Sequence, residues 1–151
     1  HPGDLQGAFL AIAATDDEQV NQQVWKEAQA GNILVNVVDD PDHCTFIAPA
    51  VVRRGPLTLA ISTSGASPAL SRHLRQQLEE TFGPEYATYV TLLGEIRQRS
   101  LVSVPAKRRR AFWDDLLASD LLDLILAGDE DAARQRAEEI LHHHASPEAG
   151  E

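Results

Sequence analysis

The chain has 151 residues, of which 43% are hydrophobic and 24% are charged, a usage that favours one compact domain or one and a half. No apolar run approaches the roughly 20 residues that span a bilayer, and no secretory signal opens the chain, so we expect a cytoplasmic protein with no membrane partner. The single cysteine, Cys44, excludes an internal disulfide. His1 and the absence of Met favour a chain cut at its amino terminus.

The net charge of −10 is unevenly distributed along the sequence. Residues 1–52 hold one basic and eight acidic residues, residues 53–110 hold ten basic and four acidic, and residues 111–151 hold two basic and eleven acidic. The chain as a whole is acidic, but its basic segment can still bind an anion. Salt at physiological concentration limits ionic interactions to about 8–10 Å, so the distant acidic segments do not cancel this local attraction. A solvated basic face is the equal alternative. The basic run at 107–110 matches no nucleic-acid-reading motif, so we expect no nucleic acid partner.

The first half of the chain reads as a βαβ unit. An unbroken apolar run at 8–14 is typical of a parallel strand buried on both faces. Asp16 or Asp17 can cap the helix that follows, which Gly31 ends. A second apolar run at 33–38 predicts a second buried strand. The pattern therefore predicts parallel strands of the α/β class.

Two carboxylates, Asp39 and Asp40, follow the second strand. Open parallel sheets bind ligands beyond the carboxyl ends of their strands, so Thr15 and Asp39 should lie side by side at such an edge. An aspartate placed there can act as a general base. The alternative is a turn or capping aspartate before Pro41.

A hairpin and a capped helix are predicted next. Residues 45–50 and 57–62 read as strands joined by a turn at 53–56, a hairpin that extends the sheet. The turn at 62–68 then opens a helix capped by Ser67. Free N–H groups and hydroxyls at such a helix start can hold a phosphate or carboxylate, and a capped turn without a ligand is the alternative.

The rest of the chain is predicted to be helical. After Gly83 and Pro84, apolar residues recur at spacings of three or four. Short helices are expected at about 107–118, 120–127 and 129–142. The three histidines at 142–144 point in different directions on a helix, which argues against a metal site, and residues 146–151 are predicted to be a disordered tail.

Six separated segments together carry a specific order and spacing. They are residues 5–17 (LQGAFLAIAATDD), 20–21 (VN), 36–41 (NVVDDP), 46–50 (FIAPA), 60–68 (AISTSGASP) and 108–113 (RRRAFW). The first five resemble the precorrin-2 dehydrogenase and sirohydrochlorin ferrochelatase family, as in the amino-terminal domain of siroheme synthase. The last resembles that family's helical dimerisation region.

The resemblance implies an incomplete Rossmann-like parallel sheet with a β-hairpin extension, followed by an all-helical dimerisation region. It places the sheet and hairpin in residues 1–66 and the helices of a homodimer in residues 67–145. The family's glycine-rich first unit, which grips the cofactor, is not among these residues, and no Gly-x-Gly-x-x-Gly occurs anywhere in them.

The resemblance also implies NAD-dependent oxidation of precorrin-2 to sirohydrochlorin, with Fe²⁺ insertion as a second step in bifunctional members. Asp39 is then the general acid/base for both steps. The residues expected at the nicotinamide ribose are Ala14, Thr15 and Asp16. The substrate carries eight carboxylate groups. The residues expected to contact it are Asn36, Arg53, Arg54, Ser62, Thr63, Ser64, Gly65, Ser67 and Pro68. No residue set identifies a metal ligand. A shortened chelatase without NAD, and a non-catalytic tetrapyrrole-binding or dimerisation module, are the alternatives.

Overall fold

The computed structural model describes residues 1–145, so the predicted tail at 146–151 lies outside the described residues. By packing, the chain divides into two compact units. The first comprises residues 1–51 and 60–76, and the second comprises residues 52–59 and those from 77 onward. The division falls inside a hairpin and inside a helix, whereas the sequence placed a boundary between residues 66 and 67.

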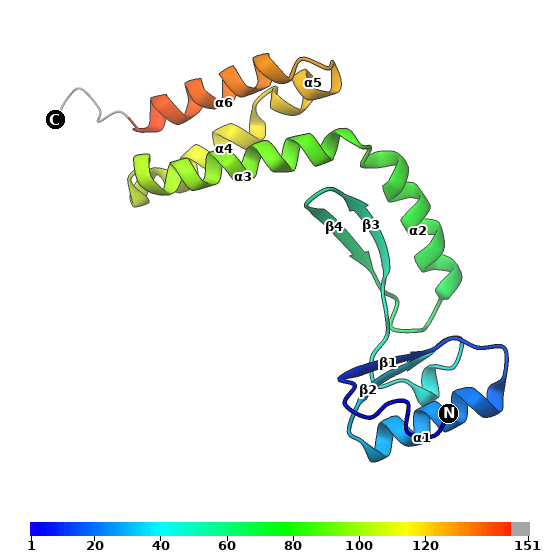
Figure 1. Ribbon diagram of the computed structural model, residues 1–151. Helices are drawn as coiled ribbons and strands as arrows, with labels where there is room; N and C mark the ends of the chain where they lie inside the picture. The colour runs from blue at the N-terminus through cyan, green and yellow to red at the C-terminus, as the bar shows by residue number, and fades with distance from the viewer. Residues whose placement is uncertain (146–151) are drawn as a thin grey trace. The chain divides into compact units, whose positions relative to one another are not determined.

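The first unit contains the predicted βαβ arrangement, drawn in blue and cyan in Figure 1. Strands β1 (Leu10–Ala13) and β2 (Leu34–Val37) pair in parallel, and helix α1 (Glu18–Ala30) connects them. Asp17 caps α1, because its carboxylate accepts the backbone N–H of Gln19 at 2.9 Å. The prediction of a parallel pair with a capped crossover helix is confirmed.

Burial differs between the two faces of β1. Ala11 and Ala13 pack with Ala28 of α1 in the core of this unit. Leu10 and Ile12, on the opposite face, are 44% and 57% exposed. The prediction that this strand is buried on both faces is therefore wrong for residues 1–145, since the core that contains α1 covers only the alanine face. In β2, by contrast, three of the four residues are buried.

The predicted hairpin is confirmed, with two corrections. Strands β3 (Ala50–Arg54) and β4 (Leu57–Ile61) form a two-stranded sheet of their own and do not extend the parallel sheet. The first strand also begins at Ala50 and not at residue 45, and it includes Arg53 and Arg54, which were predicted to lie in the turn. Thr45 instead holds the chain against β2, because its N–H donates to the carbonyl of Val35 at 2.8 Å and its hydroxyl accepts the N–H of Val35 at 2.7 Å.

Helices make up the rest of the described chain, as predicted. Helix α2 (Pro68–Thr81) begins at the expected proline, and the hydroxyl of Ser67 accepts the N–H of Leu70 at 3.3 Å. The other helices are α3 (Glu85–Ser103), α4 (Arg109–Ala118), α5 (Leu121–Leu126), α6 (Glu130–Ala145) and the 3₁₀ turns η1 (Pro41–His43) and η2 (Ala106–Arg108). No helix within residues 1–145 is long and apolar enough to cross a membrane.

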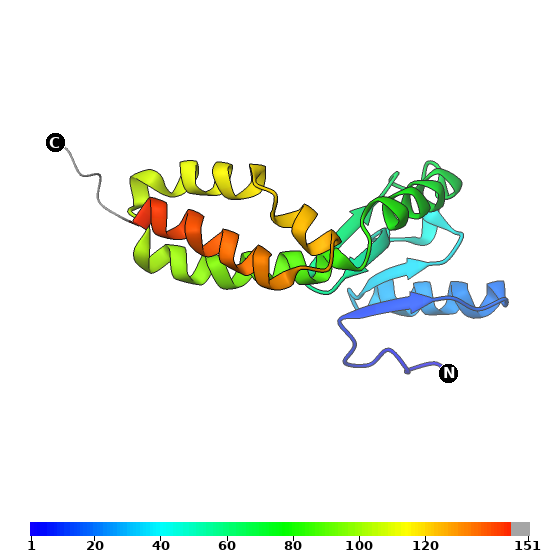
Figure 2. The same ribbon diagram turned by 90° about the horizontal axis from the view of Figure 1, so that it is seen from above.

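Helices α3 to α6 enclose the core of the second unit. Figure 1 and Figure 2 both show α6 running alongside α3. The core residues share nearly complete burial and come from all four helices and the loop after α3. They are Leu92, Ile96, Val104, Phe112, Leu116, Leu121, Ile125, Ala133, Ala137 and Leu141. Their burial supplies the hydrophobic stabilisation of this unit.

The hairpin turn requires glycine at position 55. Gly55 has φ = 54°, and a Cβ built there would lie 2.9 Å from the Cβ of Ala87. We expect Gly55→Ala to lower the free energy of unfolding by about 1–2 kcal/mol, because an L side chain is strained at this φ and would also clash. Urea unfolding measures the change. The control is Gly94→Ala in α3, where the added Cβ meets open space and should stabilise by about 1 kcal/mol. Equal stability of both variants would contradict the prediction.

Candidate functional site

A cavity of about 280 Å³ lies at the carboxyl ends of β1 and β2. Its walls hold four carboxylates and no basic residue, so we name it the acidic cavity. The lining residues are Thr15, Asp16, Glu18, Asn21, Gln22, Val37, Val38, Asp39 and Asp40. Parallel pairing thus brings Thr15 and Asp39 to one cavity, the edge at which such sheets bind ligands.

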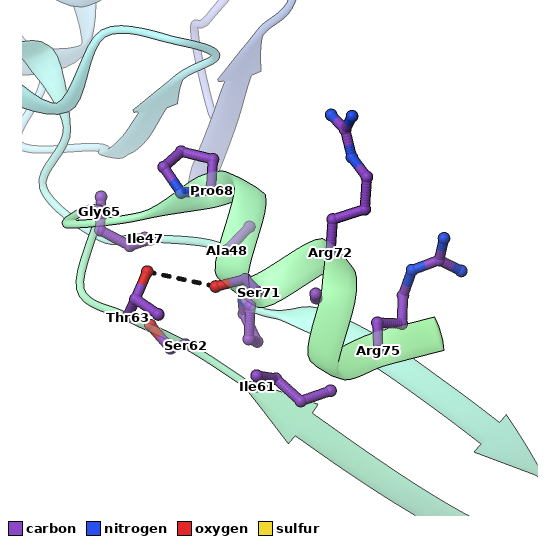
Figure 3. A pocket seen from close by; sticks show the side chains of 12 residues that line it. Ile47, Ala48, Ile61, Ser62, Thr63, Gly65, Pro68, Ser71, Arg72 and Arg75 are labelled. Atoms are coloured by element: carbon purple, nitrogen blue, oxygen red, sulfur yellow. Dashed lines mark hydrogen bonds between the residues drawn. The ribbon is translucent and has the colours of Figure 1, made fainter. Parts of the chain in front are cut away.

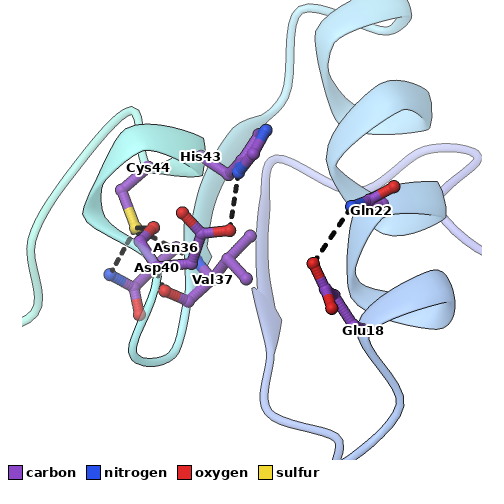
Figure 4. Close-up of polar contacts among 7 residues, drawn as sticks. All are labelled: Glu18, Gln22, Asn36, Val37, Asp40, His43 and Cys44. Carbon is purple, nitrogen blue, oxygen red and sulfur yellow. Dashed lines mark hydrogen bonds and ion pairs between the residues drawn. The ribbon is translucent and has the colours of Figure 1, made fainter.

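Asp39 and Asp40 have different surroundings in this cavity. Asp39 has φ = 62°, a region that non-glycine residues seldom adopt and that recurs at functional sites. No hydrogen bond or ion pair engages its carboxylate within the described chain. The carboxylate of Asp40 instead lies 2.6 Å from Nδ1 of His43 (Figure 4). The His43 ring in turn packs edge-on against Trp25. Of the two, Asp39 is the one open to an incoming ligand.

Cys44 holds the backbone on both sides of Asp39. Its sulfur lies 3.2 Å from the backbone nitrogen and 3.2 Å from the carbonyl oxygen of Val37, and 3.2 Å from the carbonyl oxygen of Asp40. From the sequence, Cys44 could only be excluded from an internal disulfide. A lone cysteine in a sequence carries no signal of such a role, because its partners are backbone atoms.

Asn36 is buried beneath the same loop. Its amide nitrogen donates to the carbonyl of Phe46 at 3.0 Å and lies 3.4 Å from the sulfur of Cys44 (Figure 4). The side chain lines neither the acidic cavity nor the second cavity described below. The structure therefore assigns Asn36 a role in holding the segment after β2, and a direct contact with substrate stays a prediction.

We expect Cys44→Ala to lower the stability of the first unit by about 1–2 kcal/mol, because it leaves the partly buried N–H of Val37 without its sulfur partner. Denaturant unfolding followed by tryptophan fluorescence measures this loss in a Trp113→Phe background, where Trp25 of the same unit is the one remaining tryptophan. Cys44→Ser is the matched control, since a hydroxyl keeps one donor and acceptor at the same place. An alanine variant as stable as the wild type would show that these contacts contribute nothing.

The residues predicted to border the nicotinamide ribose lie at the end of β1. Thr15 and Asp16 line the acidic cavity, and Ala14 is exposed just before them. Asn21 fixes this end of the strand, because its Oδ1 accepts from the hydroxyl of Thr15 at 2.8 Å and its amide donates to the carbonyl of Thr15 at 2.9 Å. The sequence did not single out Asn21 as a site residue.

The acidic cavity suits one part of a nicotinamide dinucleotide. Carboxylate and hydroxyl oxygens accept hydrogen bonds from ribose hydroxyls, so Thr15 and Asp16 fit the ribose of the nicotinamide end. Four carboxylates repel a pyrophosphate, and none of the 151 residues belongs to a Gly-x-Gly-x-x-Gly turn. The residues present therefore fit the reacting end of the cofactor and not its phosphates.

A second cavity, of about 370 Å³, lies between the turn after β4 and the first turns of α2 (Figure 3). Its charged residues are Arg72 and Arg75, and no carboxylate lines it, so we name it the basic cavity. Its lining residues are Ile47, Ala48, Pro49, Ala50, Ile61, Ser62, Thr63, Gly65, Pro68, Ser71, Arg72 and Arg75. All of them belong to the first unit.

Four of the predicted substrate residues, Ser62, Thr63, Gly65 and Pro68, line the basic cavity. Two others, Ser64 and Ser67, shape the turn without lining it. Ser64 has φ = 53°, and its N–H donates to the hydroxyl of Ser62 at 3.1 Å. The turn is thus held by its own hydroxyls. Contact of these residues with a substrate stays a prediction.

Arg53 and Arg54 lie in the second unit, where Arg54 has structural partners. Its guanidinium donates from Nε to the carbonyl of Phe82 at 2.7 Å and from Nη2 to the carbonyl of Glu79 at 3.0 Å. Neither arginine lines the basic cavity. The arginines that do line it, Arg72 and Arg75, were not among the residues predicted from the sequence and lie one helical turn apart on α2. The spacing of the two arginines was the available signal.

The two cavities are close neighbours. The Cβ position of Gly65, in the wall of the basic cavity, lies 3.7 Å from the ring of Pro41, two residues after Asp39. An open βαβ edge with a polar cavity at its strand ends is the arrangement of Rossmann-like α/β proteins that bind nucleotides and act on small molecules. The first unit is of this class.

Family models give the class a name. Residues 1–50 match the family described as "Putative NAD(P)-binding", residues 54–81 match "Sirohaem biosynthesis protein central", and residues 85–141 match "Sirohaem synthase dimerisation region". The three matches follow one another along nearly the whole chain. The chain belongs to the siroheme synthase family, which confirms the family resemblance.

Curated relatives and a solved structure agree with this assignment. The siroheme synthase of Methylobacillus flagellatus is 42% identical over 141 residues, which are 93% of this chain and 30% of the relative. That of Pseudoalteromonas translucida is 43% identical over 147 residues, or 95% of this chain and 31% of the relative. The structure of SirC, precorrin-2 dehydrogenase, superposes with a TM-score of 0.66 at 28% identity, covering 92% of this chain and 68% of that one. The chain spans about a third of the length of the curated relatives it matches.

Proposed function

We propose that this chain forms the substrate and proton-transfer side of an enzyme that oxidises precorrin-2 to sirohydrochlorin with NAD. The observation that carries the proposal is the Asp39 carboxylate, which has no partner among residues 1–145 and faces one cavity with Thr15 and Asp16. The similarity to SirC, precorrin-2 dehydrogenase, supports the choice of substrate.

The geometry suggests how the chain's own residues act. Bound NAD⁺ supplies the hydride acceptor. Thr15 and Asp16, with Asn21 behind them, hold the nicotinamide ribose at the end of β1. Asp39, at the end of β2, takes the proton that leaves when the macrocycle gains its new double bond. Asp39 has a left-handed backbone, and Cys44 contacts the carbonyls of Val37 and Asp40 on either side of it, which holds the loop that carries this carboxylate.

The proposal extends to two finer points. Fe²⁺ enters as a substrate in a second reaction, in which the same carboxylate accepts the pyrrole N–H protons that the metal displaces. The protein also works as a homodimer, since residues 85–141 match the dimerisation region of siroheme synthases.

A spectrophotometric assay with precorrin-2 tests the main proposal. In the full chain, addition of NAD⁺ should produce NADH at 340 nm together with the absorbance of sirohydrochlorin, in equal amounts. Later addition of Fe²⁺ should then give the spectrum of siroheme. Absence of NADH in folded protein that a separate titration shows to bind NAD⁺ would reject the dehydrogenase function, and oxidation without metal insertion would reject only the second step.

A further inference from the structure

His43 contacts a carboxylate of the acidic cavity without lining the cavity itself. We propose that His43 is a positioning residue, which orients Asp40 as a second acceptor, beside Asp39, for the N–H protons of the macrocycle. This role rests on the proposed metal insertion and deepens it. When a divalent metal ion enters a cyclic tetrapyrrole, two N–H bonds break as metal–nitrogen bonds form. Each carboxylate then takes up one of the two protons and later releases it to water.

Asp39 and Asp40 both line the acidic cavity, although they are consecutive residues. Successive side chains of an extended strand point to opposite sides. The left-handed backbone at Asp39, where φ is 62°, breaks this alternation directly after β2. Two carboxylates are thereby brought to one cavity, in the number that the departure of two protons requires.

The His43 ring holds one oxygen of Asp40 and leaves the other available. Nδ1 of His43 lies 2.6 Å from Oδ2 of Asp40 (Figure 4). An ionised carboxylate only accepts hydrogen bonds, so Nδ1 carries the hydrogen and donates it. Oδ1 of Asp40 has no hydrogen-bond partner within residues 1–145. Asp39 is the more open of the two carboxylates, yet Asp40 also keeps one oxygen for a ligand.

The donor ring is itself fixed on two sides. It packs edge-on against Trp25 of α1, with 4.6 Å between the ring centroids. The backbone N–H of His43 also donates to the carbonyl of Asp40 at 3.2 Å, which closes the turn η1. A donor held in this way restricts the rotation of the Asp40 carboxylate, and an acceptor in a fixed orientation takes up a proton more readily than a mobile one.

Two substitutions of His43 separate the donor from the ring. His43→Phe keeps a ring against Trp25 and removes the N–H, whereas His43→Asn removes the ring and keeps an N–H donor near the place of Nδ1. In the full chain with sirohydrochlorin and Fe²⁺, His43→Phe should lower kcat for metal insertion by about tenfold, and His43→Asn by less than about threefold. The absorbance of siroheme gives each rate.

His73→Phe is the matched control, because His73 is exposed on α2 and lines neither cavity, so this variant should insert the metal at the wild-type rate. The oxidation step gives a second comparison. It releases a single proton, for which Asp39 suffices, so His43→Phe should slow oxidation by a smaller factor than metal insertion. Equal losses in both reactions would overturn the inference. So would a phenylalanine variant as fast as the wild type, or an asparagine variant as slow as the phenylalanine one.

Binding decides the inference if a variant does not fold or if the chain inserts no metal. The copper(II) chelate of sirohydrochlorin has the same carboxylates but no N–H, and copper(II) in such a ring takes up a further ligand only weakly. The wild type should therefore bind metal-free sirohydrochlorin about tenfold more tightly than the chelate, and Asp40→Asn should reduce this preference. Equal Kd values in the wild type would overturn the inference. Failure of the proposed function looks different, because neither NADH nor siroheme then forms while the binding preference persists.

Discussion

Replacing Asp39 by Asn should lower kcat for precorrin-2 oxidation by about a hundred- to ten-thousandfold while the Kd for the tetrapyrrole changes little. The amide is nearly the same size as the carboxylate but cannot take up the proton, and positioned general bases contribute factors of this order. Asparagine also tolerates the left-handed backbone at this position, where φ is 62°, so the fold is preserved. Single-turnover absorbance traces, with binding titrated separately, measure both quantities.

Asp42→Asn is the matched control for this experiment. Asp42 lies three residues further along the same loop, is exposed and does not line the acidic cavity, so its variant should keep wild-type turnover. Asp40→Asn should fall between the two, because it weakens the contact with His43 without removing the proton acceptor. Equal activity in the Asp39 and Asp42 variants would refute the assignment of the general base.

The elements of the fold were predictable because their signals are local. Asp17 and Ser67 are capping residue types and so indicate where helices begin, and the spacing of apolar residues predicts the helices after Pro84. The exposed face of β1 was not predictable from its composition. An unbroken apolar run is typical of a strand buried on both faces, yet Ile12 is 57% exposed. The start of β3 was missed because a side chain, Thr45, took the place of a ladder partner beside β2.

The site was predictable where it depends on strand ends and not where it depends on tertiary contacts. Parallel pairing alone placed Thr15 beside the Asp39 edge. Nothing local showed that Cys44 would brace this loop, or that Arg54 would donate to carbonyls of the α2–α3 corner. Arg75 stood one turn after Arg72 in the sequence, but its place in a cavity wall required the fold of the turn opposite.

Shortening a side chain in the core of the helical unit should lower the free energy of unfolding strongly. Phe112 is completely buried, and its ring packs edge-on against Trp113 at 5.3 Å and against His144 of α6 at 5.7 Å. We expect Phe112→Ala to lower the free energy of unfolding of this unit by about 3–5 kcal/mol, because the change removes buried apolar surface and leaves a cavity. Guanidinium chloride unfolding followed by helical circular dichroism measures the loss.

Leu117→Ala provides the comparison, since Leu117 is on the same helix, loses an aliphatic side chain and is 57% exposed. It should cost less than about 1 kcal/mol, because little of its surface is removed from water on folding. If the helical unit forms the dimer, the Phe112 variant should also dissociate at a higher protein concentration than the wild type. The reason is that destabilising each protomer shifts the coupled equilibrium toward separate chains. Sedimentation over a range of protein concentrations measures this dissociation. Similar unfolding midpoints for the Phe112 and Leu117 variants would mean that this core does not govern the stability of the helices.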